Sequence, residues 1–185
     1  GLFGVPLRVA GTYAFLFVLF GSALERCRGS EFFFDLASAL TGKSAGGPAK
    51  IAVISSGLYG TISGSPTSDV VTTGAITIPI MKRLGYRPSF AGAVEVAAST
   101  GGSLLPPVMG AAAFIMAEYT GIPYRDIALA AIIPAILFYL PIYLQVHLRA
   151  VKTGLQGLRP NEIPNLFTTL SNGWLFIVPL IAISW

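Results

Sequence analysis

Charged residues are scarce in this sequence, and cysteine and histidine are almost absent. Of its 185 residues, 11% are Asp, Glu, Lys or Arg, whereas 54% are hydrophobic. The mean hydropathy is +0.72. A soluble globular domain carries roughly twice that charged fraction. The scarcity of charge therefore excludes an ordinary soluble domain and indicates an all-α integral membrane protein embedded in the lipid bilayer.

The rare residue types also exclude several functions. The lone Cys27 rules out an intrachain disulfide, and the lone His147 rules out a histidine-based metal site. The net charge is only +4, without a basic stripe, so no nucleic acid is expected as a partner. A serine protease would need a base near Ser63 or Ser65, and an aspartyl membrane protease would need a second aspartate beside Asp69. We therefore expect no enzymatic activity and no cofactor.

The centre of the chain is an apolar run, 54–81, that is broken by the polar segment 63–69. Each apolar arm is shorter than the ~20 residues that span a bilayer. Basic residues flank the run on both sides: Lys43, Lys50, Lys82, Arg83 and Arg87. Positive charge at both ends places both ends on the cytoplasmic side, which predicts a re-entrant helical hairpin over 48–83. Irregular backbone at membrane depth needs cover from protein or a water-filled cavity, so the tip predicts a polar site.

A second interrupted run covers 88–120. The sequence Gly101-Gly102 and the sequence Pro106-Pro107 divide it into two helical segments. We therefore predict one discontinuous transmembrane helix. A hairpin followed by a broken helix is typical of secondary transporters, in which unwound carbonyls bind Na⁺ and half-helix N-termini attract anionic substrate.

The rest of the chain predicts simpler helices. Transmembrane helices are expected over 9–26 and 126–149, and a truncated one over 173–185, so we expect a fragment of a longer permease. Residues 31–42 predict an amphipathic helix with Leu40 on its apolar face and Ser38 on its polar face. This helix lies at the membrane interface or, alternatively, packs on the flank of the protein itself.

Several ordered blocks carry a resemblance to a known family. They are 46–49 (GGPA), 60–65 (GTISGS), 71–74 (VTTG), 78–82 (IPIMK), 98–102 (ASTGG), 106–114 (PPVMGAAAF) and 121–124 (GIPY). The earlier blocks resemble the large membrane subunit of TRAP (tripartite ATP-independent periplasmic) transporters. The blocks from residue 98 onward are similar to the TAXI branch, whose permeases are often fused 4TM/12TM proteins.

The resemblance implies a Na⁺-coupled importer of organic acids or amino acids that does not use ATP. A periplasmic substrate-binding protein would deliver the solute, and a small membrane subunit would be separate or fused. The implied location is the bacterial or archaeal cytoplasmic (inner) membrane, with several crossings. The implied fold is an elevator-type transporter half, one of two inverted repeats. A proton-coupled transporter of the same fold and a re-entrant-loop channel remain alternatives.

The resemblance also assigns candidate site residues by position. The implied Na⁺ ligands are Ser63, Gly64, Ser65, Asp69, Thr100, Gly101 and Gly102. The implied substrate contacts are Ser65, Pro66, Thr67 and Ser103. Two positions depart from the family pattern: Asp69 stands where Asn is common, and Ser103 where the TAXI branch often has Gln. A carboxylate at position 69 offers a further cation ligand or a group that titrates with protons.

Structural alternatives compete with some of these roles. Asp69 is also suited to cap the N-terminus of the second hairpin arm. Glu95 is expected to pair with a nearby Lys or Arg rather than to contact substrate. Ser55 and Ser56 are expected to bond carbonyls of their own helix rather than a ligand. Of Thr72 and Thr73, one is expected to face the site.

Overall fold

The structure is a computed structural model that describes residues 4–174, 176 and 178. Within those residues it contains helices and loops and no β-strand. The elements in order are α1 (Val5–Val9), the π-helical η1 (Ala10–Ala14), α2 (Phe15–Arg26), α3 (Gly29–Thr41), α4 (Gly47–Ser63), α5 (Pro66–Thr72), α6 (Gly74–Arg83), α7 (Pro88–Gly102), α8 (Ala111–Thr120), α9 (Tyr124–Thr153), the 3₁₀ turn η2 (Pro160–Glu162) and α10 (Leu166–Asn172). The truncated helix predicted over 173–185 falls largely outside the described residues.

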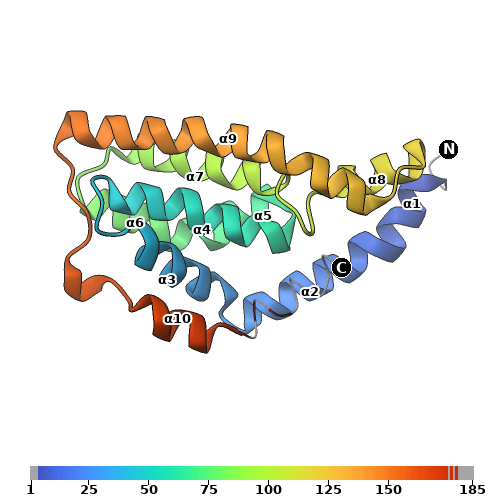
Figure 1. The fold of residues 1–185 in the computed structure, drawn as a ribbon, viewed down its shortest axis with the longest axis horizontal. Coiled ribbons are helices and arrows are strands. Elements are labelled where there is room, and N and C mark those ends of the chain that lie inside the picture. Colours follow the sequence, from blue (N-terminus) through green and yellow to red (C-terminus); the bar gives the residue numbers. More distant parts are fainter. Residues whose placement is uncertain (1–3, 175, 177, 179–185) are drawn as a thin grey trace.

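The core of the molecule is formed where α4, α6, α7 and α9 pack together (Figure 1). Small side chains dominate it, with larger ones filling the remaining space: Ala49, Ala52, Val53, Met81, Tyr86, Ala91, Val94, Ala98 and Val146. Alanine lets helix backbones approach closely, which is the usual packing device of helices in membranes. The tightest of these contacts joins α4 to α7 and thereby sets the geometry of the region described below.

The polar segment 63–69 reverses the chain direction. α4 ends at Gly64, whose φ of 57° is the left-handed conformation that glycine adopts at helix ends. Ser65 is extended, and Pro66 begins α5 at the position where its missing N–H has no cost. α5 and α6 then return alongside α4 (Figure 1). The second arm is therefore two helices, which meet at Thr73.

A non-helical segment, 103–110, separates α7 from α8. The amide of Val108 donates a 3.2 Å hydrogen bond to the carbonyl of Thr61 in α4. The hydroxyl of Tyr124, at the start of α9, lies 2.8 Å and 2.6 Å from the carbonyl oxygens of Pro107 and Val108. Both neighbours supply hydrogen-bond partners for backbone that a helix would otherwise satisfy.

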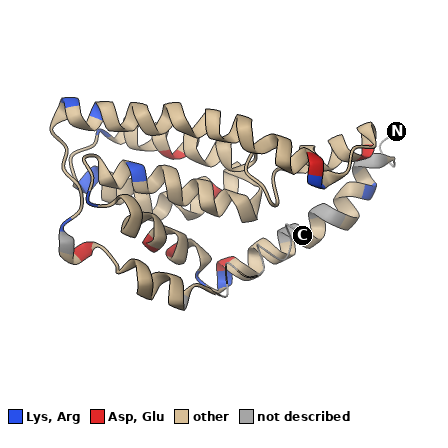
Figure 2. Ribbon diagram, in the orientation of Figure 1, with Lys and Arg blue, Asp and Glu red and all other residues tan. Residues whose placement is uncertain are grey.

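α9 is the one helix, within the described residues, that is long and apolar enough to cross a membrane. It runs from Tyr124 to Thr153, somewhat beyond the predicted bounds of 126–149, and contains Pro134 and Pro141. Lys and Arg residues gather at the end of the bundle where α9 ends and α4 begins (Figure 2). The distribution agrees with the basic flanks of the hairpin in the sequence.

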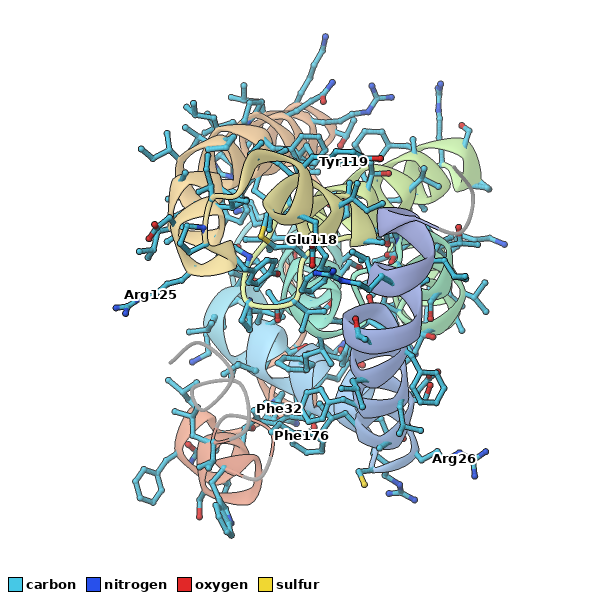
Figure 3. The ribbon with its side chains drawn as sticks, turned by 90° about the vertical axis from the view of Figure 1, so that its right-hand side faces the viewer. Arg26, Phe32, Glu118, Tyr119, Arg125 and Phe176 are labelled. Carbon is cyan, nitrogen blue, oxygen red and sulfur yellow. The ribbon has the colours of Figure 1, made fainter. Side chains whose placement is uncertain are left out.

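α3 packs against α4 and α10, and its position at the membrane interface stays a prediction. The assignment of its faces was wrong in two places. Ser38 is fully buried, and Leu40 is 57% exposed. The buried face instead centres on Phe32, which stacks on Phe176 with 5.0 Å between ring centroids (Figure 3). Aromatic packing, rather than polarity, therefore orients this helix.

The N-terminal helices lead away from the bundle core. The helix predicted over 9–26 is formed by η1 and α2, with α1 ahead of them. Arg8 of α1 donates to Glu118 of α8 across 2.8 Å, an ion pair at the periphery of the molecule. Glu118 lies at the end of the molecule that faces the viewer in Figure 3. Such exposed pairs contribute little to stability, about 0–1 kcal/mol.

Candidate ion and solute site

Two glycines bring the hairpin against the helix break. A Cβ atom added to Gly60 of α4 would lie 2.4 Å from the Cα of Gly102 in α7. A Cβ added to Gly102 would lie 2.7 Å from the Cα of Gly60. Neither position has room for a side chain, because the two backbones are in direct contact. The end of α7 is thus placed within reach of the hairpin tip.

The tip itself touches the non-helical segment. A Cβ on Gly64 would lie 2.1 Å from the carbonyl oxygen of Met109. Met109 has a φ of 58°, which is rare for a residue with a side chain. The hairpin tip and the break were predicted separately from the sequence, and the structure brings them into one region.

Asp69 lies beside the contact between Gly60 and Gly102, the glycine crossing, and is fully buried. Its Oδ1 atom accepts a hydrogen bond from the hydroxyl of Ser63. Its Oδ2 atom has no hydrogen-bond partner within the described residues, and it approaches the Cβ positions of Gly60 and Gly102 to 3.1 Å and 3.0 Å. A buried oxygen without a partner costs free energy unless a proton, cation or other ligand satisfies it.

The capping alternative for Asp69 was wrong. α5 begins at Pro66, with Ser65 in the N-cap position and no side-chain capping bond. Asp69 lies within α5, and its own amide donates to the Ser65 carbonyl across 3.0 Å. The burial of Asp69 is therefore not explained by the needs of a helix terminus.

The predicted Na⁺ ligands divide into two groups. The structure brings Ser63, Gly64, Asp69 and Gly102 together around the crossing. Thr100 is exposed and donates to the carbonyl of Val96 across 2.7 Å. Gly101 faces α9, since a Cβ there would lie 2.5 Å from the ring of Phe138. Ser65 is exposed at the tip.

The predicted substrate contacts lie on the rim of the same region. Ser65 and Thr67 have exposed side chains, with the half-buried Pro66 between them. Ser103 donates to the carbonyl of Thr100 across 2.9 Å. Ser103 also lines a cavity of about 530 Å³ between α8 and α9, to which Asp126 contributes a carboxylate. Ser103 therefore lines a cavity to which none of the three tip residues contributes.

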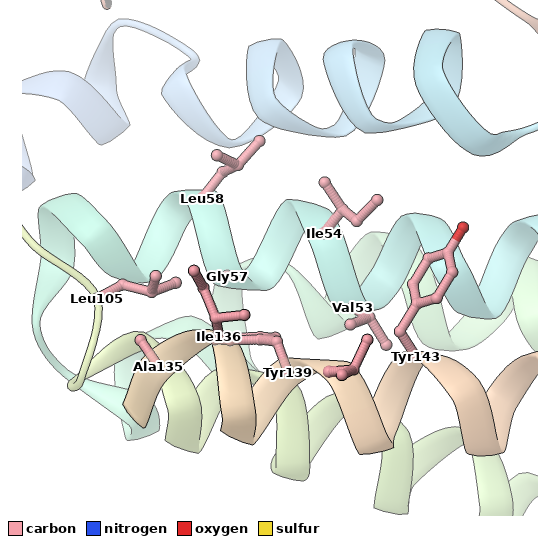
Figure 4. A pocket seen from close by; sticks show the side chains of 10 residues that line it. Val53, Ile54, Gly57, Leu58, Leu105, Ala135, Ile136, Tyr139 and Tyr143 are labelled. Carbon is pink, nitrogen blue, oxygen red and sulfur yellow. The ribbon is translucent and has the colours of Figure 1, made fainter. Parts of the chain in front are cut away.

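A further cavity of about 350 Å³ separates α4 from α9 (Figure 4). Its lining is aliphatic apart from Tyr139 and Tyr143, with side chains such as Val53, Leu105 and Ile136. Such a lining offers no charged partner to an anionic solute. We therefore do not assign solute binding to this cavity.

A second buried carboxyl group lies in a cluster of hydroxyls that the sequence did not predict. Glu95 of α7 is fully buried. Its Oε1 atom accepts from Ser56 of α4 across 2.7 Å and from Thr73 across 2.5 Å. Ser99 lies 3.4 Å from the same oxygen, and Thr77 of α6 donates to Oε2. The four hydroxyl groups come from both arms of the hairpin and from α7 itself.

Two expectations fail at this cluster. Glu95 was predicted to pair with Lys or Arg, but none of the ion pairs found in the described part of the chain includes it. Ser56 was predicted to bond its own helix, but it donates to Glu95. A signal did exist, because Thr73 and Thr77, and likewise Glu95 and Ser99, are four residues apart and share a helix face. The contact between these faces has no signal in one sequence.

These features define a class of membrane protein. A reversing helical pair with a polar tip, packed through glycines against an interrupted helix, is the type of site that secondary transporters build from broken helices. The family model of the tripartite ATP-independent periplasmic transporter, DctM component, matches residues 3–185. The chain therefore belongs to this family, the large membrane permeases of TRAP transporters.

Individual relatives agree. The chain is 28% identical over 134 residues to the C4-dicarboxylate TRAP transporter large permease protein DctM of Pseudomonas aeruginosa, covering 72% of this chain and 31% of the relative. It is 26% identical over 168 residues to the sialic acid TRAP transporter large permease protein SiaM of Vibrio cholerae, covering 90% and 39%. It is 28% identical over 122 residues to the ectoine TRAP transporter large permease protein TeaC of Halomonas elongata, covering 66% and 28%.

The chain thus spans between 28% and 39% of the length of these three relatives. These three relatives are named as transport permeases. TRAP large permeases are inner-membrane proteins that in general work with a periplasmic binding protein and a small membrane subunit.

Proposed function

We propose that this chain is one half of the transport domain in a Na⁺-coupled importer of organic acids or amino acids. α4, α5 and α6 form a re-entrant hairpin over 48–83, and α7 and α8 form a discontinuous transmembrane helix. A second, inverted repeat completes the site, and the domain moves as an elevator in a multi-pass permease. A periplasmic binding protein delivers the solute, and a small membrane subunit, separate or fused, supports the permease. The blocks from residue 98 onward favour the TAXI branch.

One observation carries this proposal: the buried Oδ2 atom of Asp69 has no hydrogen-bond partner within the described residues and lies at the Gly60–Gly102 crossing. A Na⁺ ion prefers hard oxygen ligands, and the region offers the Asp69 carboxylate, the Ser63 hydroxyl and main-chain carbonyls. A charged group at membrane depth is costly and usually functional. The coupling ion would bind beside this carboxylate, and closure of the hairpin tip over it would link ion and solute.

The solute class rests on the family and on local chemistry. Two of the three relatives above are named for acids, C4-dicarboxylate and sialic acid. The hairpin tip, where a solute would bind, carries the exposed residues Ser65 and Thr67. The Ser65 and Thr67 hydroxyls would add hydrogen bonds to a carboxylate. Ser103 would contact a different part of the solute, since it lines the neighbouring cavity.

The test is uptake of candidate acids by the full-length permease in proteoliposomes, with its binding protein, with and without a Na⁺ gradient. The proposal expects uptake that requires both the Na⁺ gradient and the binding protein. Uptake driven only by a proton gradient would overturn Na⁺ coupling and leave the fold assignment standing. Flux without either requirement would indicate a channel and would overturn the transport mechanism.

A further inference from the structure

A small pocket lies at the basic end of the bundle, where the chain turns from α6 into α7 and meets the end of α9. Its volume is about 180 Å³, and the residues that line it include Arg87, Phe90, Arg149 and Thr153. Sites for drug-sized ligands have volumes of roughly 300–1,000 Å³. The pocket is therefore sized for one small chemical group, and none of its residues belongs to the candidate ion and solute site.

Two arginine side chains line this pocket without an anionic partner. Arg87 comes directly before the first residue of α7, and Arg149 lies near the end of α9. Neither belongs to an ion pair in the described part of the chain. Glu162, which lies 3.9 Å from Arg83 at the end of α6, does not line the pocket. Because two like charges at one pocket repel each other, a bound anion would stabilise both.

Aromatic rings hold the Arg149 side chain in place. Its Cζ atom lies 4.7 Å from the centroid of the Phe90 ring, and Phe90 stacks on Tyr86 with 5.9 Å between ring centroids. A guanidinium group packs on a ring through its flat face, whereas its N–H donors lie in its own plane. The stack therefore fixes the positive charge at the pocket and leaves the plane of donors for a ligand.

The chemistry and the position of the pocket both favour a phosphate group. The planar N–H fork of arginine matches the oxygens of a phosphate and binds them in pairs. Lys and Arg residues gather at this end of the bundle (Figure 2), and the basic flanks of the hairpin predict that it faces the cytoplasm. The cytoplasmic leaflet carries anionic lipids, whose headgroups bind in basic pockets of membrane proteins.

Apolar surface next to the pocket adds a place for the rest of a lipid. Leu148, which precedes Arg149 in α9, is 66% exposed, and Val151 is 59% exposed. Because α9 is apolar enough to cross the bilayer, this surface continues along the helix into the hydrocarbon region. A phosphate in the pocket and an acyl chain along α9 could therefore belong to one molecule.

From these contacts we propose that the pocket binds a phosphate group between Arg87 and Arg149, and that an anionic membrane lipid supplies it. The bound phosphate neutralises both guanidinium groups and bridges the start of α7 to the end of α9. Its acyl chains lie against the apolar surface of α9. The site is separate from the ion site at Asp69, and it depends neither on Na⁺ coupling nor on the identity of the solute.

The test measures thermal unfolding of the full-length permease, purified in detergent and stripped of lipid. It is titrated with phosphatidylglycerol, with phosphatidylcholine, and with sodium phosphate against sodium chloride of equal ionic strength. The natural protein is compared with the double variant Arg87→Gln/Arg149→Gln. The matched control is Lys82→Gln/Lys152→Gln, which removes the same charge from exposed residues near the pocket that do not line it.

Phosphatidylglycerol should raise the melting temperature of the natural protein and of the lysine control to a plateau, and the uncharged phosphatidylcholine should raise it less. In the arginine variant the half-saturating concentration should rise at least about tenfold, because charge-assisted contacts are lost. If that variant does not fold, Arg149→Lys serves instead. It keeps the charge without the planar fork and should still weaken the binding of phosphatidylglycerol.

Two results would change or end the proposal. Arginine-dependent stabilisation by sodium phosphate, without any by phosphatidylglycerol, would keep the phosphate site and overturn the lipid as its source. The pocket assignment would be overturned if neither phosphatidylglycerol nor sodium phosphate stabilised the natural protein. It would also be overturned if the arginine and lysine variants lost affinity equally, since the effect would then come from the overall charge of this end.

Discussion

Asp69 and Glu95, the two fully buried carboxyl groups of the described residues, lie in opposite hydrogen-bonding environments. Asp69, near the hairpin tip, has one oxygen bonded to Ser63 and one without a partner in the described structure. Glu95 lies on α7, which packs against the hairpin, and has both oxygens bonded to hydroxyl groups. The first arrangement leaves room for a ligand to complete it. The second already has hydroxyl donors on both oxygens.

The surrounding residues differ in the same way. Around Oδ2 of Asp69 the neighbours are glycines, which bring backbone close and leave that oxygen without a side-chain donor in the described structure. Around Glu95 they are serine and threonine, whose hydroxyls supply donors from three helices. Two buried acids of similar chemistry thus acquire different roles from the residue types opposite them. Substitutions at and around the two acids test that difference.

Gly102→Ala should abolish uptake by the full-length permease. The added Cβ would lie 2.7 Å from the Cα of Gly60 and 3.0 Å from Oδ2 of Asp69. Because backbone cannot yield as a side chain can, α4 and α7 must separate, at a cost of about 1–3 kcal/mol. Uptake and thermal unfolding measure the two effects.

The matched control is Gly92→Ala on the same helix, where an added Cβ meets nothing within 4 Å. This change should leave uptake normal and stabilise the helix by up to about 1 kcal/mol. Normal uptake by Gly102→Ala would show that transport does not need the close Gly60–Gly102 contact. The ion site could then no longer be placed at that contact.

Asp69→Asn should change ion dependence far more than stability. Asparagine keeps an oxygen for Ser63, and its amide replaces an atom that already lacks a partner. We expect stability within about 1 kcal/mol of the natural protein, and at least a tenfold loss in apparent Na⁺ affinity, about 1.4 kcal/mol. Uptake at graded Na⁺ concentrations measures the affinity. Asp35→Asn, on the exposed surface of α3, should change neither quantity, and an unaltered Na⁺ response in Asp69→Asn would reduce Asp69 to a structural residue.

Thr77→Val should destabilise the protein without altering Na⁺ affinity. Thr77 is the donor that the structure assigns to Oε2 of Glu95, and valine of similar shape cannot replace the hydrogen bond. An unsatisfied buried acceptor costs about 1–3 kcal/mol. Thermal unfolding in detergent provides the measurement. The control is Thr153→Val at the exposed end of α9, where the hydroxyl bonds only to carbonyls of its own helix. Equal melting temperatures for the two variants would contradict the proposed difference between the buried acids.

How far the sequence predicts this molecule depends on whether a feature is local. Gly64, Pro66 and the break after Gly102 are local signals, because each fixes backbone geometry at its own position. They predicted where helices end and that the two breaks matter. The Glu95 cluster depends on which faces of α4, α6 and α7 meet, and a single sequence carries no register between them. For the same reason the contact of Gly101 with Phe138 could not be predicted, and its role as an ion ligand stays a prediction.

The smallest predicted difference separates a bonded from an unbonded hydroxyl, the same contrast that separates Glu95 from Asp69. The Tyr139 hydroxyl donates to the Ala98 carbonyl across 2.6 Å, so Tyr139→Phe should cost about 1 kcal/mol. The buried Tyr86 hydroxyl has no partner in the described structure, and burial raises the pKa of Tyr86 to about 12. The hydroxyl therefore stays protonated but donates no hydrogen bond in the described structure. Tyr86→Phe should leave the free energy of unfolding unchanged or increase it slightly, and the ring should stay stacked on Phe90. Thermal unfolding of both variants measures the difference. A greater loss of stability for Tyr86→Phe than for Tyr139→Phe would show that the stability contributed by a buried polar group does not depend on whether its hydrogen bonds are satisfied.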